Sequence, residues 1–365
     1  MVRSEKKHRI IFIDLMRAFA VFQMVQGHTI DALLAPEFRS DQYTLYYLWN
    51  FMRGMTAPIF MFTAGTVFTY LFRLADEPFE KNPRVKKGFF RFLLLVLIGY
   101  LLRYPTYTIF DFSSVTQDRL NIFFAVDVLQ LIGFGLLFVM VAAYLAEKLK
   151  LSDTIIFSLF ALLFFITTPF IQRINWINFL PQPIAGYFYD GSGSLFPLFP
   201  WAGYVVLGGV LGSYLAKNPL VFKTNKFSLN LAIAGGTLLL AVEVVVFIAS
   251  KYFNYHSVES SYSLEIIFFR VGFVLLLNSL VSYVSQKIES IPRIIILVGR
   301  NTLLIYVVHL MIIYGSAWNP GLSFYYANSL NVFTTILIAA AMVLLMGLMV
   351  ILLNKLKFRN KQLVT

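Results

Sequence analysis

The chain of 365 residues contains no cysteine, only four histidines and few charged residues. The absence of cysteine excludes disulfides, thiolate catalysis and cysteine-ligated metal sites, and no zinc-type spacing of other ligands appears. Charged residues make up 13% of the chain, whereas 59% of it is hydrophobic and 17% aromatic. A soluble domain of this length does not need so much apolar residue, so the composition indicates an integral membrane protein of the all-α class.

Ten stretches are long and apolar enough to cross a bilayer as helices, which predicts a polytopic bundle. They are residues 10–34, 46–72, 88–104, 121–147, 153–171, 195–216, 227–250, 263–284, 293–316 and 329–354. No internal repeat or low-complexity segment interrupts them. We therefore expect residues 1–365 to form a single domain.

Basic residues are concentrated in alternate connections between these spans. One set, which includes both termini, holds most lysines and arginines, and the other holds only Arg39, Arg119, Arg173 and Lys251. The positive-inside rule then places both termini in the cytoplasm, and an even number of spans agrees. The N-terminal contribution comes from Arg3, Lys6, Lys7 and Arg9. The net charge of +12 follows from this topology, so we expect no nucleic-acid partner.

The first span carries charged and ionisable side chains on one face. They are Asp14, Arg17, His28 and Asp31. At about 100° per residue all four share one stripe, with roughly 21 Å of helix rise between Asp14 and His28. Charges at that depth are costly in lipid, so they are expected to face protein or water and to serve function.

His28 is the first catalytic candidate. A neutral imidazole is suited to take a proton from a hydroxyl or amine, and Asp31 is placed three residues on to orient it. The alternative is a histidine that is only hydrogen-bonded inside the bundle. For His309, with Thr302 on its face and Tyr306 nearby, a packed histidine and a functional one are equally supported.

The remaining polar residues divide by depth. Arg17 and Arg300 fall in the inner halves of their spans, where guanidinium groups suit an anion that enters from the cytoplasm. Arg53 falls in an outer half. The outer loops carry aromatic and polar side chains suited to a sugar-like acceptor, with an interfacial aromatic belt as the alternative. The acceptor candidates are Trp176, Asp190 and Trp318.

Three segments carry a resemblance to a known family. The stretch from Ile13 to Ala20 followed by His28 resembles the first helix of transmembrane acyltransferases. Residues 51–66 are similar to the second helix of the bacterial relatives of heparan-alpha-glucosaminide N-acetyltransferase. Residues 299–309 resemble a late helix shared across the wider superfamily.

The resemblance implies an enzyme that takes acetyl groups from cytoplasmic acetyl-CoA and delivers them to a sugar-like acceptor on the outer face. It carries the catalytic role onto His28, with Asp31 and His309 as further catalytic candidates. The donor candidates are Asp14, Arg17, Arg53, Arg300 and Asn301. In the animal enzyme the histidine precedes a Trp-Asn pair, but here Tyr46 lies ahead of Trp49 and Asn50, so acceptor identity does not carry over.

Two other functions stay open at this stage. Buried charges also mark the substrate paths of secondary transporters, although no pair of interrupted spans recurs in two halves. An O-acyltransferase acting on a lipid or a polysaccharide is the other. For the acetyltransferase we expect acetyl-CoA as donor, no metal, membrane lipids as surroundings, a possible homodimer, and residence in the bacterial cytoplasmic membrane.

Overall fold

The computed structural model of the chain describes residues 10–218, 220–253 and 260–362. The basic residues at positions 3–9, which contribute to the orientation argument, lie outside the described residues. Almost every element is a helix, so the predicted all-α bundle is confirmed. The exception in the described part is a hairpin of two short antiparallel strands, β1 (Gly315–Ser316) and β2 (Asn319–Pro320).

The chain divides into two compact units. Unit 1 comprises residues 1–60 and 287–365, and unit 2 comprises residues 61–286. Helix α2 (Thr44–Arg73) begins in unit 1 and ends in unit 2.

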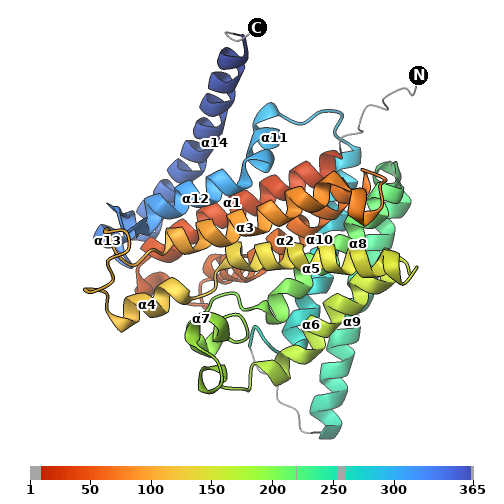
Figure 1. Cartoon of the computed structure of the whole chain (residues 1–365), viewed down its shortest axis with the longest axis horizontal. Coiled ribbons are helices and arrows are strands. Elements are labelled where there is room, and N and C mark those ends of the chain that lie inside the picture. The colour runs from red at the N-terminus through yellow and green to blue at the C-terminus, as the bar shows by residue number, and fades with distance from the viewer. Residues whose placement is uncertain (1–9, 219, 254–259, 363–365) are drawn as a thin grey trace. The chain divides into compact units, whose positions relative to one another are not determined.

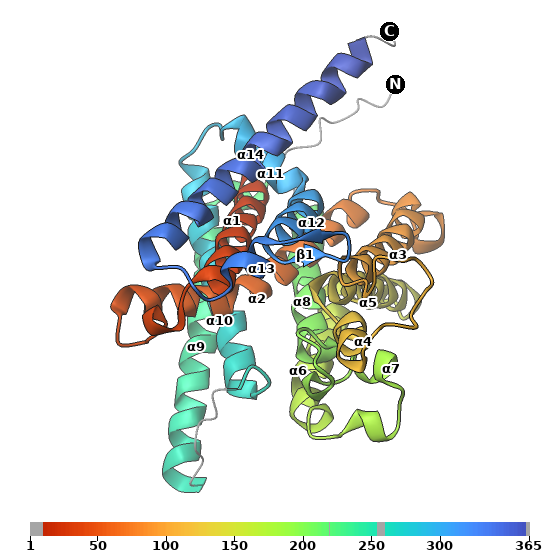
Figure 2. The same ribbon diagram turned by 90° about the vertical axis from the view of Figure 1, so that its left-hand side faces the viewer.

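Unit 1 is built around the first helix. Its remaining elements are η1 (Pro36–Phe38), the first part of α2, α11 (Arg293–Arg300), α12 (Thr302–Ile313), the strand hairpin, α13 (Leu322–Tyr326) and α14 (Val332–Gln362). Helix α1 (Ile11–Leu33) packs against α11, α12 and α14, as Figure 2 shows. The first helix, which carries the charged stripe, therefore packs against helices from the last part of the chain.

Unit 2 contains most of the long helices. Its elements are the end of α2, η2 (Phe79–Lys81), α3 (Pro83–Leu102), α4 (Gln117–Phe124), α5 (Val128–Lys148), α6 (Asp153–Ile171), η3 (Trp176–Asn178), α7 (Gln182–Ala185), η4 (Asp190–Ser192), α8 (Leu198–Lys217), η5 (Val221–Lys223), α9 (Asn225–Phe253) and α10 (Leu264–Gln286). Helices α3 and α5 lie side by side, α6 packs on α8, and α9 packs on α10 (Figure 1).

Every predicted span corresponds to helix, with differences in continuity. In the described part of the chain, seven helical stretches are long and apolar enough to cross a membrane, or eight if one bent pair is a single span. That pair is α11 and α12, which meet at an angle of 78°, so the predicted span 293–316 is broken. Helices α1 and α3 are not among these stretches, and the count of ten spans stays a prediction.

Glycines bring α2 and α8 into backbone contact. A Cβ atom added at Gly208 would collide with the carbonyl of Phe62, and one at Gly212 with the carbonyl of Thr66. The hydroxyl of Thr66 donates to the carbonyl of Gly208 at 3.0 Å. The GxxxG spacing of Gly208 and Gly212 thus serves close helix packing, as such small-residue motifs do in membranes.

We expect Gly208→Ala to destabilise the protein, because the obstructing atoms belong to backbone and cannot rotate away. The control is Gly236→Ala in α9, where an added Cβ meets nothing within 4 Å. Overpacking of this kind costs about 1–3 kcal/mol, whereas alanine at an unobstructed helical glycine is neutral or stabilising. Thermal unfolding of both variants in the same detergent measures the difference. Equal midpoints would contradict the close approach.

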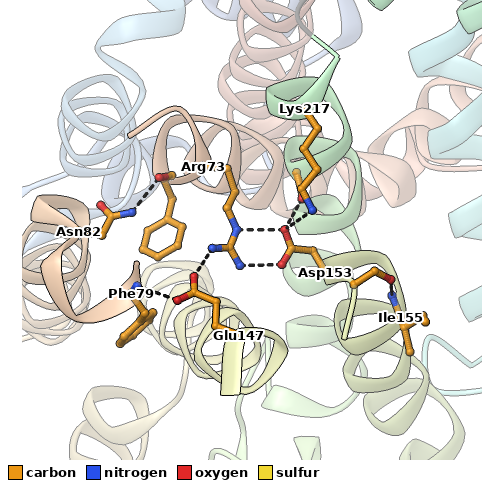
Figure 3. Close-up of polar contacts among 10 residues, drawn as sticks. Arg73, Phe79, Asn82, Glu147, Asp153, Ile155 and Lys217 are labelled. Atoms are coloured by element: carbon orange, nitrogen blue, oxygen red, sulfur yellow. Dashed lines mark hydrogen bonds and ion pairs between the residues drawn. The ribbon is translucent and has the colours of Figure 1, made fainter. Parts of the chain in front are cut away.

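An ion cluster joins four helices of unit 2 (Figure 3). Asp153, the first residue of α6, accepts two hydrogen bonds from the Arg73 guanidinium, at 2.6 and 3.0 Å. It also accepts one from Ser213 at 2.5 Å and lies 3.2 Å from the Lys217 ammonium. Glu147 pairs with the same guanidinium at 2.5 Å. Arg73 and Lys217, which belong to connections rich in basic residues, therefore also hold the ends of α2, α5, α6 and α8 together.

The predicted orientation is testable in this cysteine-free chain. Asn178 lies exposed in the connection after α6, and Glu77 lies exposed in the connection after α2. We expect Asn178→Cys to react with a membrane-impermeant thiol reagent in intact cells, and Glu77→Cys to react only after permeabilisation. The reverse pattern would overturn the cytoplasmic placement of the termini.

Candidate functional site

Two of the four histidines lie together in unit 1. The ring centroids of His28, on α1, and His309, on α12, are 5.4 Å apart with the planes tilted by 52°. The Nδ1 atom of His28 lies 3.4 Å from the hydroxyl oxygen of Tyr314, at the C-terminal end of α12. His28 is partly buried, so this group combines an approachable imidazole with a second imidazole behind it.

His309 is fully buried and its tautomer follows from its neighbours. Its Nδ1 lies 2.7 Å from the carbonyl oxygen of Ile305. A carbonyl oxygen only accepts, so Nδ1 carries the proton and Nε2 of the neutral ring presents a lone pair. Nε2 is buried and has no hydrogen-bond partner among the described residues. The structure thus places His309, with Nε2 as a hydrogen-bond acceptor, beside His28. The sequence alone supported a packing role and a functional role for His309 equally.

The other end of the α1–α12 pair holds arginines. Gly299, on α11, packs against the α1 backbone at Asp14 and the Cβ of Arg17, with an added Cβ 3.3 and 3.5 Å from these atoms. Arg300 follows directly and is exposed, and Asn301 occupies the break before α12. The first N–H groups of a helix lack intrahelical partners and carry partial positive charge. Arginine side chains and a helix N-terminus therefore lie at one end of the pair, and the imidazoles at the other.

Asp31 and Arg53 pair near the imidazole end. The Arg53 guanidinium donates to the Asp31 carboxylate at 2.7 Å, and both side chains are partly exposed. The backbone carbonyl of Asp31 accepts from Arg39, which also bonds the carbonyl of Leu34 and so satisfies the last turn of α1. Arg53 lies at the level of Asp31, about 21 Å along α1 from Arg17. Its part in donor binding stays a prediction.

A buried polar chain on α1 was not anticipated from sequence. The indole of Trp49 donates to Gln26 at 2.8 Å, and the Gln26 amide donates to Gln23 at 2.8 Å. Both glutamines are buried in α1. The sequence does carry a signal for this contact, because two amide side chains spaced by three residues in an apolar helix lie on the same face. Tyr314 was also missed, because nothing local marks it as a neighbour of the first helix.

The acceptor candidates fall in different units. In unit 2, Trp176 donates to the last turn of α6 at Ile171 and stacks on Phe188, which makes it part of the loop's own packing. Asp190 is exposed, and its backbone N–H donates to Gln172. In unit 1, Trp318 is 52% exposed at the tip of the β1–β2 hairpin. The acceptor role of all three residues stays a prediction.

Comparison with known proteins extends the argument. Residues 9–241 match the family described as heparan-alpha-glucosaminide N-acetyltransferase, catalytic. The matched range contains His28 and Arg17, whereas Arg300 and His309 lie beyond it. No curated protein matches the chain significantly. Because the match covers more than half of the chain, and the helices fit a membrane enzyme, the chain belongs to the heparan-alpha-glucosaminide N-acetyltransferase catalytic family of membrane acetyltransferases.

Proposed function

We propose that this protein transfers an acetyl group from cytoplasmic acetyl-CoA to an amino or hydroxyl group of a sugar-like acceptor on the outer face. The observation that carries the proposal is the pair of imidazoles, His28 and His309, at one end of two helices whose other end presents arginines. Membership of an acetyltransferase family favours this function over a secondary transporter. The bacterial cytoplasmic membrane is its proposed location.

His28 is the proposed catalytic base. As the acceptor nitrogen or oxygen attacks the thioester carbonyl, the imidazole takes its proton, the C–S bond breaks, and coenzyme A leaves as a thiolate that is then protonated. In a two-step route the imidazole itself attacks first and an acetyl-imidazole then passes the acetyl group to the acceptor. Both routes need a neutral, approachable imidazole, and the partial exposure of His28 makes it approachable.

His309 and Asp31 support the same step in this proposal. The Nε2 lone pair of His309 is available to accept a proton or a hydrogen bond in the reaction, because its other ring nitrogen is held by Ile305. Asp31, paired with Arg53, supplies negative charge one turn beyond His28. A carboxylate in that place is proposed to help orient the imidazole.

The proposed donor site lies at the arginine end. Arg17, Arg300 and Asn301 would meet the phosphates or the pantetheine arm, because guanidinium groups bind phosphate bidentately. Asp14, one turn before Arg17, is proposed to fix that arginine. Arg17 and His28 are separated by about 17 Å of helix rise, which is the distance the pantetheine arm would cover along α1.

Thermal unfolding in the presence of coenzyme A tests this function. We expect coenzyme A and acetyl-CoA to raise the unfolding temperature saturably, since a ligand at 100 times its Kd adds about 2.7 kcal/mol to the stability. Adenosine monophosphate with acetate, which lacks the pantetheine arm, is the control. Identical midpoints with coenzyme A and with the control would contradict an acetyl-CoA-dependent enzyme.

A further inference from the structure

A buried arginine in unit 2 forms no ion pair with a carboxylate in the described part of the chain. Arg270 lies on α10 and is only 8% exposed. Among the described residues, no acidic side chain forms an ion pair with it, and its Nε atom is buried without a hydrogen-bond partner. The Asp153 cluster shows the usual arrangement, in which two carboxylates meet a single guanidinium. Arg270 departs from it.

Only neutral groups surround the Arg270 guanidinium among its described contacts. Its Nη atoms donate to the hydroxyl and the carbonyl of Ser261, at 3.1 and 3.4 Å, and its Cζ lies 5.3 Å from the centre of the Trp201 ring. The hydroxyl of Tyr204, close by, donates to the carbonyl of Ile267. An aromatic face and one serine compensate a buried charge incompletely, because a guanidinium taken out of water needs an opposite charge and filled hydrogen bonds.

The guanidinium points toward the end of its helix. Side chains of a helix lean toward its N-terminus, and the Arg270 Nη atoms reach Ser261, which precedes the start of α10 at Leu264. Ser261 and Tyr262, which follow one another just before α10, are partly exposed, so the guanidinium has neighbours at the protein surface. The charge pattern of the connections places this end of α10 on the outer side of the membrane.

Tyr262, which follows Ser261, is a partly exposed neighbour of the Arg270 guanidinium. Burial raises the pKa of Tyr262, and the nearby carboxylate of Asp190 raises it further, whereas the Arg270 guanidinium acts in the opposite direction. The phenol therefore stays protonated at neutral pH, with the Asp190 carboxylate as one of its hydrogen-bond partners. Both the exposed Asp190 carboxylate and the buried Arg270 guanidinium act on this phenol. Asp190 acts on Tyr262 and forms no ion pair with Arg270, so the guanidinium still lacks a counter-charge among the described residues.

We propose that Arg270, with Ser261 and Tyr262, binds one anionic group, namely the oxygens of a carboxylate, sulfate or phosphate. The fork of the guanidinium matches such groups, and an anion there supplies the missing charge. The inference goes beyond the acetyl transfer proposed above and does not depend on it, since no residue of that site takes part. The anion belongs either to a soluble molecule on the outer side or to a lipid headgroup.

The stability of the anion-free protein tests the proposal. An arginine that serves binding is a buried, uncompensated charge when its ligand is absent, and so it lowers the stability of the ligand-free protein. A structural arginine instead stabilises the protein in every buffer. We expect Arg270→Met to unfold at the same temperature as the unchanged protein, or higher, in neutral detergent with chloride as the only anion. The control is Lys251→Met, which removes an exposed outer cation in the same unit.

Anion titrations complete the test and separate the two sources. We expect low-millimolar sulfate or glucuronate to raise the unfolding temperature saturably above a chloride control of equal ionic strength, in the unchanged protein and in Lys251→Met but not in Arg270→Met. Low concentrations are needed because sulfate at high concentration stabilises proteins by exclusion. A soluble ligand gives this increment in detergent. A lipid ligand gives it only in nanodiscs with phosphatidylglycerol, compared with phosphatidylcholine alone.

Two results would overturn the site. One is a rise in unfolding temperature on adding the anion that persists in Arg270→Met, or that no anion or lipid produces in the unchanged protein. The other is a drop in the unfolding temperature of Arg270→Met that is equal in all buffers, which identifies Arg270 as a structural residue. Coenzyme A binding is measured in the same preparations, so a failure of the anion site is distinguishable from a failure of the proposed acetyltransferase.

Discussion

Replacing His28 with alanine is expected to abolish acetyl transfer while coenzyme A affinity stays within a few-fold of the unchanged protein. The imidazole acts on the proton that moves in the transition state, and it lies about 17 Å along α1 from Arg17, at the opposite end from the proposed phosphate contacts. General acid–base catalysis contributes about 10²–10⁴-fold, and loss of a nucleophile contributes more. Single-turnover measurement of acetyl transfer from labelled acetyl-CoA reports the chemical step.

The matched comparison is His309→Asn. Asparagine keeps an N–H that can bond the Ile305 carbonyl but removes the Nε2 lone pair, so it separates packing from chemistry at this buried position. We expect a smaller loss of rate than in His28→Ala. Both variants are compared at equal folded amounts, because a buried polar change also affects stability. If His28→Ala retains most of its rate while His309→Asn is inactive, the catalytic base belongs to α12.

The second large effect is expected from Arg17→Ala on coenzyme A binding. Loss of a charge-assisted hydrogen bond to a phosphate costs about 1.5–3 kcal/mol, which corresponds to roughly a tenfold or greater rise in Kd. Arg17 lies on the first helix where Gly299 packs against it, at the break between α11 and α12. Isothermal titration of coenzyme A into the purified protein measures this change.

The control for Arg17 is Lys355→Ala. Lys355 is an exposed cation of the same unit near the end of α14, so its removal changes the net charge equally without touching the proposed site. We expect its Kd to stay within about twofold, since exposed charges act weakly through solvent. Unchanged coenzyme A affinity in a folded Arg17→Ala protein would remove Arg17 from the donor site.

Local patterns in the sequence predicted much of the fold. Apolar length predicted an all-α polytopic bundle and the positions of its helices, because a helix that crosses lipid must satisfy its backbone internally. The GxxxG spacing of Gly208 and Gly212 is another such pattern, and these glycines make the close contact between α8 and α2. Helical periodicity also placed Arg17 and His28 on one stripe of α1. Each of these features depends on residues that are neighbours along the chain.

Other features depend on which helix lies against which, and only the tertiary structure decided them. The contact of His28 with His309 and Tyr314 joins the first helix to the last third of the chain. The break between α11 and α12 lies inside a stretch that hydropathy alone presents as a continuous span. That no described acidic residue pairs with Arg270 is equally invisible along the chain. Periodicity reports the face on which a side chain lies, whereas its partner is set by packing between segments distant in sequence.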